Sequence, residues 1–250
     1  MLFRSALSLL QKAESQRQFK ENGECDFSLS LPLIGRFRVN VFSQRGSSAV
    51  SIRRIYTSLP DPATLAIPQT VMDLADCNKG LVLVTGPTGC GKTTTLAALI
   101  NRINESRAAH ILTLEDPIEY LHQHKKGIVN QREIGTDSSS YQSALRSALR
   151  QTPDVILIGE MRDLETIAIA LTAAETGHLV FSTLHTVGAA KTIDRIIDVF
   201  PAGQQQQVRV QLSTVLQAVV SQQLIPVENS GQIAAFEIML MNSAIRNMIR

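Results

Sequence analysis

The pattern of apolar and polar positions changes part of the way along the chain. Before that change, three short runs alternate polar and apolar residues, at 25–33, 36–42 and 49–55. A period of two is typical of half-buried antiparallel strands, and Pro32 and Gly35 favour a turn between the first two runs. We therefore expect a small antiparallel sheet near the N-terminus.

Prolines mark the end of this region. Three of them crowd into 60–68, a stretch that neither a helix nor a central strand tolerates well. We place a linker at 59–70, between an N-terminal domain at 1–58 and a larger domain at 71–250. The length of 250 residues fits one complete α/β domain with a smaller companion.

Beyond the linker the chain carries continuous apolar runs, typical of strands buried on both faces, separated by segments with helical spacing. Alternation of this kind predicts βαβ units and a parallel sheet, so the fold class is α/β. After Pro201, apolar residues from Val208 to Val220 recur every three or four positions, which predicts a further helix. The apolar runs are 81–84, 111–114, 155–158 and 179–181, and the helical segments are 96–103, 144–149 and 167–172.

Residues 86–93 match the pattern G-x-x-x-x-G-K-[ST], directly after a predicted strand and at the start of a predicted helix. Glycines in such a loop let backbone amides approach phosphate oxygens, aided by the helix dipole. We expect Lys92 on the β- and γ-phosphates and Thr93 on Mg²⁺, so the motif predicts ATP and Mg²⁺ as cofactors. The expected nucleotide-binding residues are Gly86, Pro87, Thr88, Gly89, Cys90, Gly91, Lys92, Thr93 and Thr94.

Acidic residues follow two of the predicted strands, at the edge where a parallel sheet binds ligands. Glu160 is expected to hold Mg²⁺ together with Thr93 or to polarise the attacking water; the alternative is an ordinary first-turn acid of a helix. Glu115 directly follows its strand and is the better candidate for a general base. Asp116 and Glu119 fit a turn cap and a solvated charge, although a functional role for Glu119 stays open.

Two histidines bracket the predicted strand at 179–184. His178 and His185 are seven residues apart, which places them at opposite ends of the strand rather than in one zinc site. His185 falls at the same sheet edge as Glu115 and Glu160. There it either senses the γ-phosphate or has no catalytic role, and the sequence leaves both alternatives open.

Composition excludes several classes of protein. The chain has 24 basic and 22 acidic residues, a net charge of +2 and no polybasic block, so we expect no nucleic-acid partner. Cys25, Cys77 and Cys90 form neither a zinc pattern nor a disulfide pattern, which favours a reducing cytoplasm. The apolar runs are too short to span a bilayer, and residues 1–10 fit an amphipathic helix better than a signal peptide.

Taken together, these motifs resemble the secretion ATPases of type II secretion and type IV pili, and within them the branch that retracts pili in twitching motility. The resemblance extends over 26–250, nearly the whole chain. The segments that carry it are the P-loop at 86–93, an acid-rich box at 115–119, a second acidic motif at 158–163, a histidine box at 176–186 and the last segment, 244–250.

The resemblance implies a RecA-like P-loop NTPase domain preceded by a partial PAS-like α+β domain, with the C-terminal helices truncated. It also implies a homo-oligomer, usually a hexameric ring, in which arginines of the N-terminal domain reach a neighbour's nucleotide. The candidates are Arg38 and Arg53, with Arg54 as the alternate, and the simpler interpretation is a set of strand-surface arginines.

The function implied by the resemblance is an ATP-hydrolysing motor that drives pilus retraction and pilin disassembly. The implied partner is a platform protein of the inner membrane, and the implied location is the cytoplasmic face of that membrane, with membrane association only through partners. One alternative is a pilus-assembly or type II secretion ATPase, but these usually carry a four-cysteine zinc insertion, and no cysteine follows Cys90 here. Another alternative is a non-catalytic nucleotide-binding fragment.

The segment 244–250 predicts a short amphipathic helix. Either its polar side couples nucleotide state to a partner, or its apolar side merely packs the end of the domain. The expected apolar stripe consists of Ala244, Ile245, Met248 and Ile249, and the expected polar side of Arg246, Asn247 and Arg250.

Overall fold

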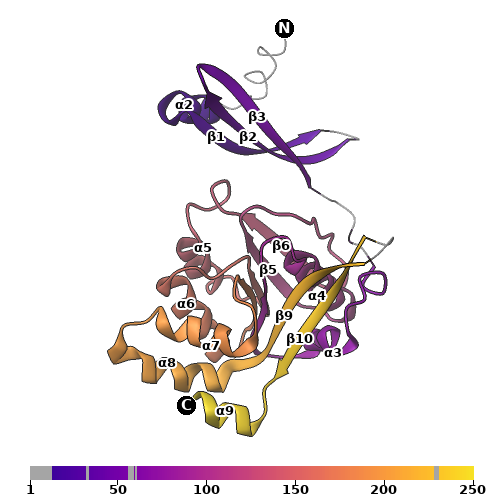
Figure 1. Cartoon of the computed structure of the whole chain (residues 1–250), viewed down its shortest axis with the longest axis vertical. Coiled ribbons are helices and arrows are strands. Elements are labelled where there is room, and N and C mark those ends of the chain that lie inside the picture. Colours follow the sequence, from indigo (N-terminus) through magenta and orange to yellow (C-terminus); the bar gives the residue numbers. More distant parts are fainter. Residues whose placement is uncertain (1–12, 32–33, 56–58, 60, 228–230) are drawn as a thin grey trace. The chain divides into compact units, whose positions relative to one another are not determined.

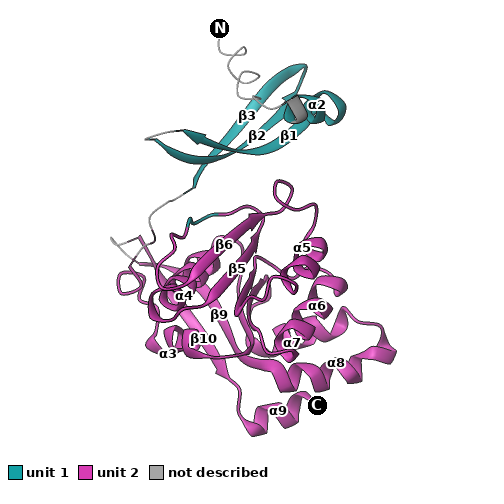
Figure 2. Ribbon diagram, turned by 180° about the vertical axis from the view of Figure 1, so that it is seen from behind, with its two compact units in different colours: residues 1–58, 119–121 teal, residues 59–118, 122–250 magenta. Residues whose placement is uncertain are grey.

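The computed structural model describes residues 13–31, 34–55, 59, 61–227 and 231–250, so the helix expected at 1–10 lies outside the described residues. The chain divides into two compact units, coloured separately in Figure 2. The N-terminal unit comprises 1–58 with 119–121, and the larger unit comprises 59–118 with 122–250. No helix in the described ranges is both long and apolar enough to cross a membrane.

Over its described residues, the N-terminal unit consists of one helix on a three-stranded antiparallel sheet in the order β1-β2-β3. The three alternating runs of the sequence form these strands, as predicted. Arg45 and Gly46 make the turn between β2 and β3 with φ values of 47° and 75°, a conformation that suits a two-residue hairpin. The elements are α2 (Ala13–Asn22), β1 (Glu24–Leu31), β2 (Gly35–Gln44) and β3 (Ser47–Ile55).

The larger unit is built on a seven-stranded sheet in the order β10-β9-β4-β8-β7-β5-β6. Neighbouring strands are parallel except β10, which runs antiparallel to β9. This confirms the predicted α/β class with a mostly parallel sheet. The strands are β4 (Gly80–Thr85), β5 (His110–Glu115), β6 (Ile128–Glu133), β7 (Val155–Ile158), β8 (Leu179–Leu184), β9 (Leu216–Val227) and β10 (Gly231–Leu240).

Helices cover both faces of this sheet, as Figure 1 shows. One face packs against α5, α6, α7 and α8, and the other against α3, η1 and α4, so each face has its own apolar core. Burial on both sides explains why strands β4, β7 and β8 are continuous apolar runs. The helices are α3 (Gln69–Met72), η1 (Asp73–Asp76), α4 (Lys92–Ser106), α5 (Tyr141–Ala148), α6 (Leu164–Glu175), α7 (Ala189–Asp198), α8 (Ala202–Val215) and α9 (Ser243–Ile249).

The helix expected to run through Val220 is wrong in its second half. Helix α8 ends at Val215, and Leu216 turns into an extended conformation, with ψ of 131°, that begins β9. Val219 and Val220 are fully buried because β9 pairs with β4 on one side and β10 on the other. A short apolar run fits both periods, and here strand pairing decides between them.

The C-terminal helix α9 also differs from the expected stripe. Ile249 is buried, but Met248 is 75% exposed. Arg246 does not project away from the domain: its Nη1 donates to the carbonyl of Thr214 at 2.9 Å and to that of Ser213. The arginine therefore binds the last carbonyls of α8, which a helix leaves without intrahelical partners.

Candidate active site

The P-loop joins β4 to α4, with a conformation that requires its glycines. Gly86, Gly89 and Gly91 have φ values of 141°, 79° and 89°. A Cβ at Gly86 would lie 2.1 Å from the backbone oxygen of Gln222, so no other residue fits there. The loop ends at the first turn of α4, where unpaired amides and the helix dipole favour an anion.

Lys92 is held on this loop by hydrogen bonds. Its side chain is buried, and Nζ donates to the carbonyl oxygens of Gly86 and Pro87, each at 2.9 Å. Thr93 and Thr94 follow in the first turn of α4 and are partly exposed. The ammonium and the hydroxyl groups thus stand together at the anion-binding end of the helix.

Glu115 ends β5 as a buried carboxylate with a fixed orientation. Its Oε1 accepts hydrogen bonds from Thr113 Oγ1 at 2.6 Å and from Gln131 Nε2 at 3.1 Å. Sequence analysis missed both donors. Thr113 could have been found, because it lies two residues earlier on the same strand face; Gln131 could not, because it depends on β6 pairing beside β5.

A chain of side chains joins the P-loop to Glu160. Thr88 Oγ1 lies 3.5 Å from His185 Nδ1, and His185 Nε2 lies 3.2 Å from Glu160 Oε2. Arg162 forms an ion pair with the other oxygen, Glu160 Oε1. The structure therefore brings His185 and Glu160 together with the loop. His178 lies at the far end of β8, where its Nδ1 is 2.9 Å from the carbonyl of Ala173 near the end of α6.

The candidate arginines lie on the N-terminal sheet. Arg38 of β2 and Arg53 of β3 are directly opposite each other in register, so they share one face. Arg54 pairs with Phe37 on the other face, which carries the apolar core of that unit. Arg36 lies two residues before Arg38 on the polar face, and sequence analysis missed it.

The remaining acidic candidates, Asp116 and Glu119, lie at the surface. Asp116 is exposed directly after Glu115, in the turn that leaves β5. Glu119 is also exposed and groups with the N-terminal unit.

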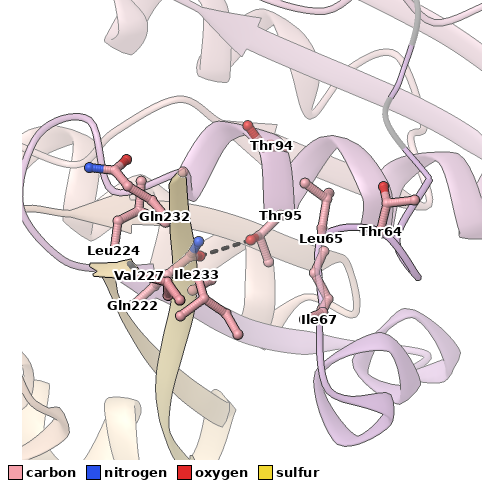
Figure 3. A pocket seen from close by; sticks show the side chains of 13 residues that line it. Thr64, Leu65, Ile67, Thr94, Thr95, Gln222, Leu224, Val227, Gln232 and Ile233 are labelled. Carbon is pink, nitrogen blue, oxygen red and sulfur yellow. Dashed lines mark hydrogen bonds between the residues drawn. The ribbon is translucent and has the colours of Figure 1, made fainter. Parts of the chain in front are cut away.

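A pocket of about 430 Å³ adjoins the P-loop. Thr94, Thr95 and Gly91 line one side, and apolar side chains that include Leu65 and Ile233 line the others (Figure 3). Gln222 of β9 is buried and accepts a hydrogen bond from Thr95 Oγ1 at 2.8 Å, so it ties the first turn of α4 to the strand behind it. Its place beside the loop depends on β9 being a strand, and sequence analysis missed it.

A strand, a phosphate-binding loop and a helix, with carboxylates at the ends of adjacent parallel strands, define a P-loop nucleotide-binding protein of the α/β class. The chain matches the family described as "Type II/IV secretion system protein" over residues 28–248, and it belongs to that family.

Two curated relatives are similar over most of this chain. A twitching motility protein of Neisseria gonorrhoeae is 55% identical over 93% of the chain, which spans 62% of that relative's length. The type IV pilus retractation ATPase PilT of Pseudomonas aeruginosa is 53% identical over 95% of the chain, which spans 69% of its length.

Among solved structures, the pilus retraction motor PilT with bound ADP superimposes with a TM-score of 0.96. It is 51% identical in sequence, and the match covers 99% of this chain and 72% of that one.

Proposed function

We propose that this protein is an ATP-hydrolysing motor subunit that drives type IV pilus retraction. The observation that carries the proposal is the linked network at one edge of the sheet, where Thr88 of the P-loop, His185 and Glu160 form a continuous chain. The similarity to a twitching motility protein and to PilT supports retraction as the output of that chemistry.

The residues present fit a nucleotide. The phosphates would lie on the P-loop amides and Lys92, and the nucleoside would enter the adjoining pocket, whose apolar walls suit a flat base. Thr95 and Gln222 hold the helix turn that borders both parts.

The oxygen donors present also fit Mg²⁺. Thr93 and Glu160 would hold it, and Mg²⁺ keeps several waters and phosphate oxygens, so two protein oxygens suffice. When bound, it would neutralise charge that develops on the phosphates. Glu115, oriented by Thr113 and Gln131, would accept the proton of the attacking water.

The arginines of the N-terminal sheet support assembly into a homo-oligomer, which we propose is a hexameric ring. Arg38 and Arg53 are like charges directly opposite on neighbouring strands, and Arg38 also forms an ion pair with Asp26, with Nε 3.7 Å from Oδ1. Two arginines on one face suit the phosphates of a neighbour's nucleotide. We also propose that the ring acts at the cytoplasmic face of the inner membrane, through a platform protein.

A pilus-assembly or secretion ATPase would share the same nucleotide site. It is less well supported because the resemblance to assembly proteins would call for a four-cysteine insertion, and no cysteine follows Cys90. Two relatives that cover most of the chain are named for twitching motility and for retraction.

Two measurements test the proposal. The purified full chain should hydrolyse ATP, and its expression should restore twitching to cells that lack their own retraction ATPase, whereas Glu160→Gln should do neither. No hydrolysis at any protein concentration would overturn the enzymatic role. Hydrolysis without restored twitching would show that the protein is an ATPase but would overturn its role in retraction.

A further inference from the structure

Tyr141 is the first residue of α5, and none of the roles above uses it. Its ring packs against the larger of the two core clusters, beside Ala144, Leu145 and Ala148 of the same helix. These residues follow Tyr141 at three, four and seven positions, so they form one helix face. The ring therefore extends the buried apolar stripe of α5, and the hydroxyl lies at the far end of the ring.

The hydroxyl lies beside the backbone of Gly159 and close to that of Glu115. A Cβ built on Gly159 would be 2.8 Å from the Tyr141 oxygen, 3.3 Å from the carbonyl of Leu114 and 3.4 Å from the Cα of Glu115. Gly159 is the residue that joins β7 to Glu160, and its amide donates to that same Leu114 carbonyl at 2.7 Å. The absence of a side chain at Gly159 leaves room for the phenol at this point.

The charges around the phenol determine the protonation state of its hydroxyl. Burial, followed by the negative charges of Asp116, Glu160 and Glu115, raises the pKa of Tyr141 well above its usual value, and Arg162 only partly opposes this. The hydroxyl therefore keeps its proton at every working pH, so it can donate a hydrogen bond but cannot act as a base. A largely buried phenol needs an acceptor, and the carboxylates whose charge acts on this one are those of Asp116, Glu160 and Glu115.

We propose that Tyr141 is a positioning residue for ATP hydrolysis, whose hydroxyl donates through one water to the carboxylate of Glu115. This inference rests on the proposed ATPase function. The donated hydrogen bond holds this acid in the orientation that the attacking water needs. Phosphate binding is assigned to the P-loop, to which Tyr141 does not belong, so we expect nucleotide affinity not to depend on it.

The simpler interpretation is that the ring only fills the core, and the two interpretations predict different behaviour for Tyr141→Phe. Loss of a donor raises the pKa of the carboxylate that accepted from it, because the hydrogen bond favours the charged form. The titratable groups around Tyr141 and Glu115 are Asp116, Glu160 and Arg162, with His185 bonded to Glu160, and the substitution leaves all of them intact.

The experiment compares the parental full chain with Tyr141→Phe, Tyr141→Leu and Lys92→Ala. Tyr141→Phe should lower kcat about tenfold, the effect of one hydrogen bond, while KM, ATP affinity and Tm stay parental. The acid limb of its kcat–pH profile should move to higher pH. Tyr141→Leu, which also removes the ring, should lower Tm in addition.

Each result has one meaning. A parental kcat and pH profile in Tyr141→Phe overturns the role of Tyr141 and leaves the ATPase proposal standing. A lower kcat with a lower Tm and an unmoved pH profile shows a packing role and overturns the inference as well. If the parental chain hydrolyses ATP no faster than Lys92→Ala, the ATPase proposal fails, and the role of Tyr141 fails with it.

Discussion

Two charged groups at the catalytic edge of the larger unit, Lys92 and Glu115, are buried and bonded to neighbours in the same unit, whereas Arg53 of the N-terminal sheet is exposed. Lys92 and Glu115 each have at least two hydrogen bonds, and both are less than a tenth exposed. Arg53 instead faces another arginine, Arg38, which also forms an ion pair with Asp26. The larger unit thus holds these two groups in place by itself, and the small sheet presents positive charge at its surface.

Unequal cores reinforce this difference. The N-terminal unit buries Cys25, Val39 and Val41 fully, with a few aromatic and aliphatic side chains around them. The larger unit has an apolar cluster on each face of its sheet. Substitutions at the catalytic edge should therefore act at any protein concentration, and substitutions of the exposed arginines should act only in the assembled protein.

The largest effect is expected for Lys92→Ala. Removing its charge-assisted contact with the phosphates should abolish hydrolysis and weaken ATP binding by roughly 1.5–3 kcal/mol. ATP affinity by calorimetry and steady-state turnover check this. Lys125→Ala, which removes a half-exposed lysine paired with Glu105, is the matched control and should leave both unchanged. Parental turnover in Lys92→Ala would contradict the P-loop assignment.

The next largest effect is expected for an arginine of the N-terminal sheet. An arginine that acts on a neighbour's nucleotide contributes on the order of 10³–10⁵ in rate, so Arg53→Ala should lose nearly all the activity that rises with protein concentration. Arg54→Ala, on the opposite face, is the control and should keep it. The proposed action of Arg53 on a neighbour's nucleotide would be contradicted if the specific activity did not depend on protein concentration and light scattering gave a monomeric mass.

A smaller effect is expected for Glu115→Gln. The amide keeps the shape of the side chain and removes the base, so kcat should fall about 10²–10⁴-fold while ATP stays bound. Single-turnover hydrolysis and equilibrium ATP binding separate the two. Glu119→Gln, at an exposed position a few residues later, should hydrolyse ATP at the parental rate; an equal loss there would make the acid-rich segment as a whole responsible.

The smallest effect concerns stability. Arg246 binds carbonyls at the end of α8, so Arg246→Ala should lower the free energy of unfolding by about 1 kcal/mol, measured by urea denaturation. Asn247→Ala, at an exposed neighbour, should leave stability and hydrolysis unchanged. Loss of twitching in Asn247→Ala alone would assign the exposed side of α9 to retraction, and normal twitching would contradict that role.

Local rules were enough to predict the P-loop and the two acids. A phosphate-binding loop is encoded by a few consecutive residues, namely glycines at fixed spacing between a strand and a helix. Parallel strands bring Glu115 and Glu160 to the same edge of the sheet. The alternating runs likewise predicted β1, β2 and β3. These features depend on residues close together in the chain or on a general property of parallel sheets.

The partners of those groups were decided only by the tertiary structure. Gln131 reaches Glu115 because β6 pairs with β5, and Gln222 supports the loop because the chain after Val215 forms a strand. The register of β2 with β3 places Arg53, and not Arg54, on the face of Arg38. Such contacts join residues far apart in sequence, and the free energy that selects them comes from burial and pairing of whole strands, which no local pattern contains.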